Sequence, residues 1–206
     1  MLLLQDRVTP CQGYSIDYPR NAELLDELYA VDCEAYGKFA VNRSILERWV
    51  KKCPQSITII TVEGRIAGAF GLLAVSEEQI RKFIAGKLSE EKFSPLSERI
   101  TDHRFWYWSG VVLRPEFQRQ ARSLLRPLLV RGLDSWLSSS RIGHPDTYLY
   151  ATGCTAEGIS LLDKFRFEKI KEADEMADGA PLYVRNIRPD IESNRSEIRE
   201  LLSARS

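Results

Sequence analysis

The sequence predicts a single mixed α/β domain in which a mostly antiparallel sheet is flanked by helices. Three observations carry this prediction. Residues 56–75 hold two β-branched, apolar runs separated by Glu63-Gly64, a pattern typical of a β-hairpin. Residues 105–113 form the most apolar strand-like stretch, as expected of a central strand. Helical and strand-like segments then alternate from residue 115 to residue 185, which favours helices packed on a sheet.

Two helices are expected before the hairpin. The first begins near Asn21, a favourable N-cap residue. The second begins near Ser44, which has the spacing of a capping box with Glu47. Helical spacing predicts the buried faces of the two helices: Leu24, Leu28 and Val31 on the first, and Ile45, Trp49 and Cys53 on the second.

Residues 76–103 separate the hairpin from the central strand. They are rich in charge, and Ile80, Phe83 and Ile84 indicate a short helix within them. The segment is longer than a simple strand connection requires, so we interpret it as an insertion. Its charge and modest apolar content predict a mobile segment.

The chain after the central strand supplies the other layer and the second half of the sheet. Pro115 ends the strand, and a long helix follows whose apolar face includes Leu124, Leu128 and Leu133. The remaining predicted elements are a strand at 147–151, a helix at 156–165 and strands at 167–170 and 181–185. Residues 1–188 are thus expected to form one domain, followed by an amphipathic C-terminal helix at 189–206.

Composition excludes several classes of protein. The chain has 206 residues, of which 44% are hydrophobic, and its 29 basic and 29 acidic residues leave no net charge. No broad electrostatic signal for nucleic acid or a membrane surface is present. Four widely spaced cysteines, without a C-x-x-C pair, and two histidines predict no metal site. The apolar start is too short for a signal peptide, and no run approaches the roughly 20 residues of a membrane span, which predicts a cytoplasmic location.

The segment of greatest chemical interest is residues 113–125, where the central strand runs through a turn into the long helix. The first amides of a helix have no internal partners and lie at the positive end of the helix dipole. A turn there suits a pyrophosphate, provided that its residues are small enough for close approach. Ala121 and Ser123 are small, and Arg119 and Arg122 add positive charge. By itself this turn is equally compatible with a connecting loop that carries two solvated arginines.

The same segment resembles the acyl-CoA motif of the GNAT superfamily of N-acyltransferases, V-x-P-x-x-[RQ]-G-x-G-x-[GA]. Leu113, Pro115 and Gln118 match the Val, Pro and [RQ] positions. Residues 155–167 resemble a second motif of that family, N-x-x-A-x-x-L-Y-x-K-x-G-F. Leu161, Lys164 and Phe167 are the matching positions. The resemblance covers about residues 20–186 and rests on the order of elements more than on identities.

The CoA motif is degenerate. The three glycine positions of the turn hold Arg119, Ala121 and Ser123, which constrains the backbone. Leu162 stands where many members of the family carry a tyrosine that protonates the departing thiolate. Three further positions also depart from the second motif: Thr155 replaces its Asn, Gly158 its Ala and Arg166 its Gly.

The resemblance implies where acetyl-CoA, or a related acyl-CoA, would bind. The acyl-pantetheine arm would pair with the amides of Val111 and Leu113 as an additional strand does. The turn would hold the pyrophosphate. The residues expected to contact the cofactor are Val111, Val112, Leu113, Gln118, Arg119, Gln120, Ala121, Arg122, Ser123 and Thr155.

No catalytic residue can be assigned from the sequence. Amine acylation needs a base, and Tyr107 occupies the neighbourhood where members of the family often place a glutamate. Glu34, His103 and Tyr150 are the other candidates for proton transfer. Alternating aromatic residues in a central strand and its neighbour are also typical of a core, so Tyr107 and Tyr150 fit that role as well. Cys154 lacks a histidine partner in the sequence, which favours a small buried residue over a nucleophile.

The resemblance therefore implies an N-acyltransferase that moves an acetyl or other acyl group from CoA to a primary amine. A CoA-binding or regulatory module of the same fold, without turnover, is the alternative that the lost glycines and tyrosine favour. A third reading is an interaction protein. The acceptor amine is not specified, and a homodimer is compatible with the sequence. If the chain is an enzyme, residues 76–103 are expected to cover one side of the acceptor groove.

Overall fold

The computed structural model describes residues 13–96, 103–139 and 146–187, together with 196 and 200. Apart from residues 196 and 200, the C-terminal helix expected at 189–206 lies outside the described residues. The described strands form one seven-stranded sheet with the order β1-β2-β3-β4-β5-β7-β6. All neighbouring strands are antiparallel except β4 and β5, which are parallel. The fold class predicted from the sequence is confirmed.

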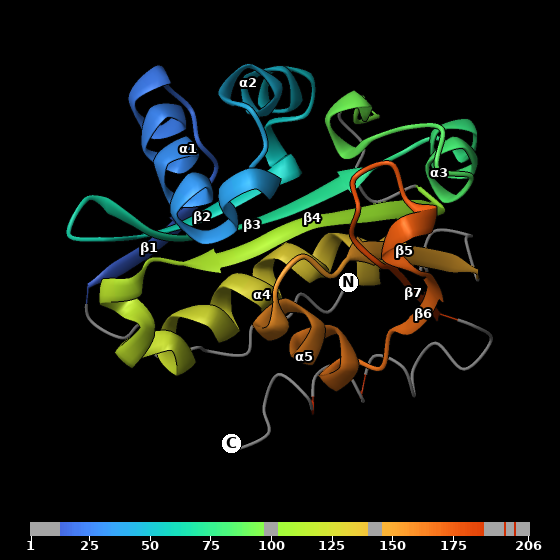
Figure 1. Ribbon diagram of the computed structural model, residues 1–206. Coiled ribbons are helices and arrows are strands. Elements are labelled where there is room, and N and C mark those ends of the chain that lie inside the picture. The colour runs from blue at the N-terminus through green and yellow to red at the C-terminus, as the bar shows by residue number, and fades with distance from the viewer. Residues whose placement is uncertain (1–12, 97–102, 140–145, 188–195, 197–199, 201–206) are drawn as a thin grey trace.

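Helices cover both faces of the sheet (Figure 1). One face carries α1 (Ala22–Tyr36), α2 (Arg43–Lys52) and α3 (Glu77–Ile84), and the other carries α4 (Ala121–Ser139) and α5 (Ala156–Lys164). Each face has its own hydrophobic cluster, because alternate residues of a strand point to opposite sides. Trp106 and Trp108 therefore join the cluster under α4, whereas Tyr107 joins the cluster under α1 and α2.

The strands lie close to their predicted positions. The bounds are β1 (Tyr14–Asp17), β2 (Ile57–Val62), β3 (Arg65–Ala74), β4 (Phe105–Leu113), β5 (Thr147–Thr152), β6 (Glu168–Lys171) and β7 (Leu182–Ile187). The hairpin turn at Glu63 and Gly64 has positive φ at both residues, as its sequence predicts. β1, a four-residue strand at the edge of the sheet, was not predicted from the sequence; among the described strands it pairs with β2 alone.

The start of α2 differs from the prediction. Asn42, rather than Ser44, is the N-cap, and its side chain accepts a hydrogen bond from the Ser44 N–H at 3.1 Å. Glu47 instead forms ion pairs with Arg43 and Lys51. The buried face is accordingly Leu46, Trp49 and Val50, with Cys53 at the C-cap. Ile45 is only half-buried.

The segment between β3 and β4 packs against the core more firmly than its composition suggests. Ser76 and Gln79 form a capping box at the start of α3, and Ile80 and Phe83 are buried beneath that helix. Phe93 is 0% exposed although charged residues precede it in a single 3₁₀ turn (Glu90–Lys92). These three apolar side chains belong to the cluster under α1 and α2, so the described part of the segment is anchored to the core, and its mobility stays a prediction.

Candidate functional site

The two parallel strands at the centre of the sheet, β4 and β5, pair over only part of their length and then separate. Residues 105–108 of β4 pair with residues 148–151 of β5, and the pairing stops at Trp108 and Ala151. A β-bulge lies at this point, because Gly71 of β3 is opposite Gly110 while the next residue, Leu72, is opposite Trp108. A bulge bends its strand. Beyond it, residues 110–113 of β4 still pair with β3 but no longer pair with β5, and we call this stretch the unpaired part of β4.

Gly71 lies opposite the bulge and leaves room for the Ser109 side chain. A Cβ atom at that position would lie 2.0 Å from the Ser109 hydroxyl, so the serine side chain would have to rotate away. A glycine within a strand often marks a bulge, where another group approaches the backbone closely.

A cleft of about 590 Å³ opens where the two strands separate. One wall is the unpaired part of β4, and the others come from α1, the turn after β4, the loop after β5 and the start of α5. Six of the residues that were expected to contact CoA line this cleft: Val111, Val112, Leu113, Gln118, Ala121 and Thr155. The expected contacts Arg119, Gln120 and Ser123 are exposed and do not line it, and the side chain of Arg122 lies outside the described part of the chain.

The turn after β4 is a 3₁₀ helix (Pro115–Gln120) that runs directly into α4. The Ala121 N–H donates to the Gln118 carbonyl oxygen, and the Ser123 hydroxyl donates to the Gln120 carbonyl oxygen at 2.9 Å. Across the cleft, Thr155 is the N-cap of α5 and accepts a hydrogen bond from the Gly158 N–H at 3.0 Å. Two helices therefore begin at this end of the cleft, where the positive ends of their dipoles favour an anionic group.

Tyr36, the last residue of α1, enters the cleft and contacts the unpaired edge of β4. Its hydroxyl donates to the Val111 carbonyl oxygen at 2.8 Å and accepts from the Val111 N–H at 3.0 Å. Gly110 permits this approach, since a Cβ there would lie 2.9 Å from the Tyr36 hydroxyl. Burial raises the pKa of Tyr36, so the phenol is the form present near neutrality. The backbone groups of Val111 that a neighbouring strand would use are thus occupied by this side chain.

Carboxyl groups line the other end of the cleft. Asp32 and Glu34 come from α1, and Glu90 comes from the segment between β3 and β4. Burial raises the pKa of Asp32 to about 6, although a hydrogen bond from the Val41 N–H, at 2.7 Å, opposes the shift. Burial also raises the pKa of Glu90 well above its usual range. Sequence reasoning missed Asp32, Tyr36 and Glu90, because no local pattern marks them.

The four candidates for proton transfer are placed differently. Glu34 lines the cleft but is exposed. Tyr107 is buried, and its hydroxyl donates to the Glu90 Oε2 at 3.0 Å and lies 3.0 Å from the Thr152 Oγ1. His103 and Tyr150 are not among the residues that line the cleft. Of the four, only Glu34 lies on the cleft itself, and Tyr107 reaches it through Glu90.

Cys154 lies beside the cleft, 3.7 Å from the Thr152 hydroxyl. Burial raises the pKa of its thiol to about 11, which keeps it protonated near neutral pH. The described residues include no group of three or more His, Cys, Asp or Glu side chains arranged to hold a metal ion. None of the described helices is long and apolar enough to cross a membrane.

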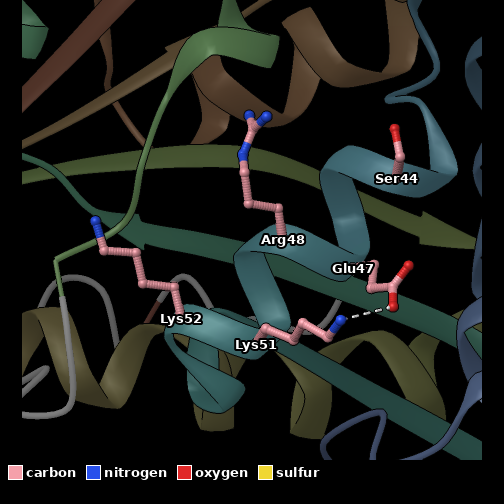
Figure 2. A pocket seen from close by; sticks show the side chains of 5 residues that line it. All are labelled: Ser44, Glu47, Arg48, Lys51 and Lys52. Atoms are coloured by element: carbon pink, nitrogen blue, oxygen red, sulfur yellow. Dashed lines mark ion pairs between the residues drawn. The ribbon is translucent and has the colours of Figure 1, made fainter.

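A second, shallow hollow lies on the exposed face of α2 and is lined by Ser44, Glu47, Arg48, Lys51 and Lys52 (Figure 2). Its charged side chains have partners within the molecule. Lys51 pairs with Glu47 at 3.2 Å, Lys52 donates to the Ser94 hydroxyl at 2.7 Å, and Arg48 donates to the Glu91 carbonyl oxygen. This surface therefore fastens the segment after α3 to α2.

Several solved structures with the same architecture are described as GNAT or GNAT-like proteins. The loading GNATL domain of CurA from Lyngbya majuscula aligns with a TM-score of 0.61 and 18% identity, covering 84% of this chain and 98% of that domain. A GNAT-family acetyltransferase from Staphylococcus aureus Mu50 aligns with a TM-score of 0.53 and 12% identity, covering 85% and 100%. The chain therefore has the GNAT fold, as the resemblance implied.

A third structure of this fold contains a ligand. It is the GNAT-like decarboxylase GphF in complex with isobutyryl-CoA, which aligns with a TM-score of 0.55 and 15% identity over 84% of this chain and all of that one. No protein-family model and no curated protein matches the sequence. At these identities the structural matches establish the fold alone.

Proposed function

We propose that this chain is a GNAT N-acyltransferase that binds acetyl-CoA or a related acyl-CoA and transfers the acyl group to a primary amine. The observation that carries the proposal is the separation of β4 from β5, which leaves one edge of a central strand unpaired beside a 590 Å³ cleft. An unpaired strand edge binds an extended chain through its backbone groups. The pantetheine arm is such a chain, and GphF binds an acyl-CoA within the same fold.

The proposed orientation follows from the two ends of the cleft. The pyrophosphate lies at the turn 115–120 and the start of α4, where the dipole favours its charge and Ala121 leaves room. The thioester lies toward the bulge at Ser109, near Val111. There a backbone N–H would polarise the carbonyl group as negative charge develops on its oxygen.

The chemistry of this proposal depends mainly on orientation. Holding the acyl-CoA and the amine in one cleft makes their reaction effectively unimolecular. Leu162, at the position of the family's tyrosine, is 4% exposed and supplies no proton. In this proposal the CoA thiolate departs without a dedicated acid and takes a proton from water.

The alternative, a CoA-binding or regulatory module without turnover, is favoured by one observation. The Tyr36 hydroxyl occupies both backbone groups of Val111, so the cleft as observed is closed at the position proposed for the thioester. An enzyme requires Tyr36 to move when acyl-CoA binds. A module that binds only the nucleotide part of CoA does not.

Acetyl-CoA is expected to raise the melting temperature of the protein, because a ligand that binds only the folded state stabilises it by mass action. At 100 times the dissociation constant the gain is about 2.7 kcal/mol, or about 5–10 °C for a domain of this size. Differential scanning fluorimetry with acetyl-CoA and a primary amine, followed by assay of the released thiol, tests binding and transfer together. Absence of any shift at millimolar acetyl-CoA contradicts the proposal. Release of CO₂ from malonyl-CoA without amide formation would indicate a decarboxylase instead.

Tyr36→Phe is expected to tighten acetyl-CoA binding about fivefold. The change removes a hydroxyl that competes for Val111, and the net value of such a hydrogen bond is about 1 kcal/mol. Isothermal titration calorimetry measures the difference. Tyr29→Phe is the matched control, since Tyr29 lies on the same helix and does not line the cleft. Unchanged or weaker binding by Tyr36→Phe would show that the hydroxyl does not compete with the ligand.

A further inference from the structure

The carboxyl groups at one end of the cleft restrict which amines can act as acceptor. Asp32, Glu34 and Glu90 line it, and Glu157, in the first turn of α5, is a further carboxyl group of the cleft. Among the described residues that line the cleft, the basic one is Arg114, which lies just after β4 and pairs with Glu27 at 3.1 Å. A concave surface lined by one sign of charge concentrates ligands of the opposite sign. This end of the cleft therefore favours a cation, and a ligand that carries its own carboxylate is repelled from it.

Glu90 is the member of this group whose geometry requires an explanation. Its Oε2 accepts the Tyr107 hydroxyl at 3.0 Å. Its Oε1 is buried and has no hydrogen-bond partner among the described residues, although the side chain lines the cleft. An unsatisfied buried acceptor destabilises a fold, so such atoms in native proteins mark a functional role or a missing partner. A donor supplied by a bound ligand would complete this one.

The position of Glu90 is fixed from several directions. Its backbone N–H donates to the Asp178 Oδ2 at 2.7 Å. Three residues further along, the Phe93 carbonyl oxygen accepts a hydrogen bond from the Trp49 indole at 2.9 Å. Arg48 and Lys52 fasten the same segment to α2. The carboxyl group is therefore held in the cleft by contacts with β4, α2 and the segment before β7, as a positioned proton acceptor must be.

The groups that face Glu90 preserve its ability to bind a proton. Asp32 from α1, Asp178 from the segment before β7 and the neighbouring Glu91 are acidic, and with burial they raise the pKa of Glu90. Tyr107 opposes the shift by hydrogen bonding, and burial keeps that phenol protonated by raising its pKa. Cys154 is also near and protonated. A carboxyl group with a raised pKa retains a proton that it has taken near neutral pH better than an exposed one.

We propose that Glu90 is the general base of the transfer and that the acceptor is an alkylammonium with no carboxylate near the amine, such as a diamine. The proposal rests on the N-acyltransferase function proposed above. In this proposal the side chains that cover Oε1 move when acyl-CoA binds, and Oε1 then receives an N–H of the acceptor. Asp32 and Glu34 favour the positive charge of the acceptor. The acceptor enters from the side formed by α1 and the segment between β3 and β4.

The reaction balances with these groups alone. The Glu90 carboxylate takes one proton from the ammonium, and the freed lone pair bonds to the thioester carbonyl carbon. The carbon–sulfur bond breaks as the tetrahedral intermediate collapses. The nitrogen loses its second proton to water, the CoA thiolate takes a proton from water, and Glu90 returns its proton to solvent. The products are the amide, CoA thiol and one released proton.

The acceptor class is tested on the unmodified protein with two probes, cadaverine and lysine, which differ by one carboxylate. With acetyl-CoA as donor, we expect kcat/KM for cadaverine to exceed that for lysine at least tenfold. Calorimetry of each amine against the free protein should show the same preference. Equal or better use of lysine overturns the inference while leaving N-acyltransfer intact. If acetyl-CoA itself does not bind, the proposed function and the role of Glu90 both fall.

Glu90→Gln tests the base. Glutamine keeps an acceptor for Tyr107 but cannot take a proton, so kcat for cadaverine should fall 100-fold or more while KM changes less than about threefold. The rise of the wild-type rate with pH through the ionisation of Glu90 should be lost as well. Glu77→Gln, on the exposed side of α3 and away from the cleft, should retain the wild-type rate. If the rate of Glu90→Gln lies within threefold of the wild-type rate, Glu90 is not the general base. The comparison of cadaverine with lysine uses the unmodified protein, so it does not depend on a variant that could fail to fold.

Discussion

Phe93→Ala is expected to lower the free energy of unfolding by about 3–5 kcal/mol, the usual range when a buried phenylalanine is truncated. Phe93 is 0% exposed, and its ring centroid lies 4.9 Å from that of Phe83 and 4.8 Å from that of Tyr107. Removing the ring leaves a cavity between the segment after α3 and the centre of the sheet. Urea unfolding with an unchanged m-value measures the loss.

Lys92→Ala is the matched control for this experiment. Lys92 is the exposed residue immediately before Phe93, so its removal should change the free energy of unfolding by less than about 0.5 kcal/mol. A loss below 1 kcal/mol for Phe93→Ala would mean that the segment is loosely attached, as its composition suggests. The position of Glu90, three residues away, would then no longer be fixed.

The segment between β3 and β4 contains a packing feature that its average composition does not reveal. Residues 76–103 are rich in charge, and this predicted mobility. Ile80, Phe83 and Phe93 nevertheless belong to the cluster under α1 and α2. A few large apolar side chains can attach a segment to the core even when most of its residues are polar, because they carry most of the buried apolar area.

Elements with a strong local signal were predicted well. The hairpin depends on Glu63 and Gly64, which lie between two β-branched runs, and β4 depends on an uninterrupted apolar sequence. The N-cap of α1 at Asn21 is likewise a local effect. The start of α2 was misplaced because Asn42 and Ser44 are both good caps two residues apart. In the structure, the Asn42 side chain caps the Ser44 N–H.

The candidate site likewise contains some residues that local motifs predicted and others that only long-range contacts reveal. Two short motifs predicted that Val111, Leu113, Gln118, Ala121 and Thr155 contact CoA. These residues line the cleft, and their contact with CoA stays a prediction. Other features depend on contacts between distant parts of the chain: the Tyr36 hydroxyl bonds to Val111, 75 positions away, and Glu90 to Asp178, 88 positions away. One sequence carries no pattern from which such pairs can be found.

Ala121→Asp is expected to weaken acetyl-CoA binding about 30-fold or more. Ala121 lines the cleft at the first position of α4, where the pyrophosphate is proposed to lie. Two unit charges about 5 Å apart repel by about 3 kcal/mol at an effective dielectric constant of about 20, of which salt removes a part. A loss of about 2 kcal/mol corresponds to the 30-fold change. Calorimetry with acetyl-CoA measures it.

The fold should tolerate this change, because an aspartate in the first turn of a helix interacts favourably with the helix dipole. Ala121→Asn is the matched control. It has nearly the same volume without the charge, so its affinity should lie within about threefold of wild type. The difference between the two variants should shrink as ionic strength rises, since only the charged one acts by repulsion. If Ala121→Asp and Ala121→Asn weaken binding equally at all salt concentrations, the bulk of the new side chain is responsible. If neither variant weakens binding, the pyrophosphate does not lie at the start of α4.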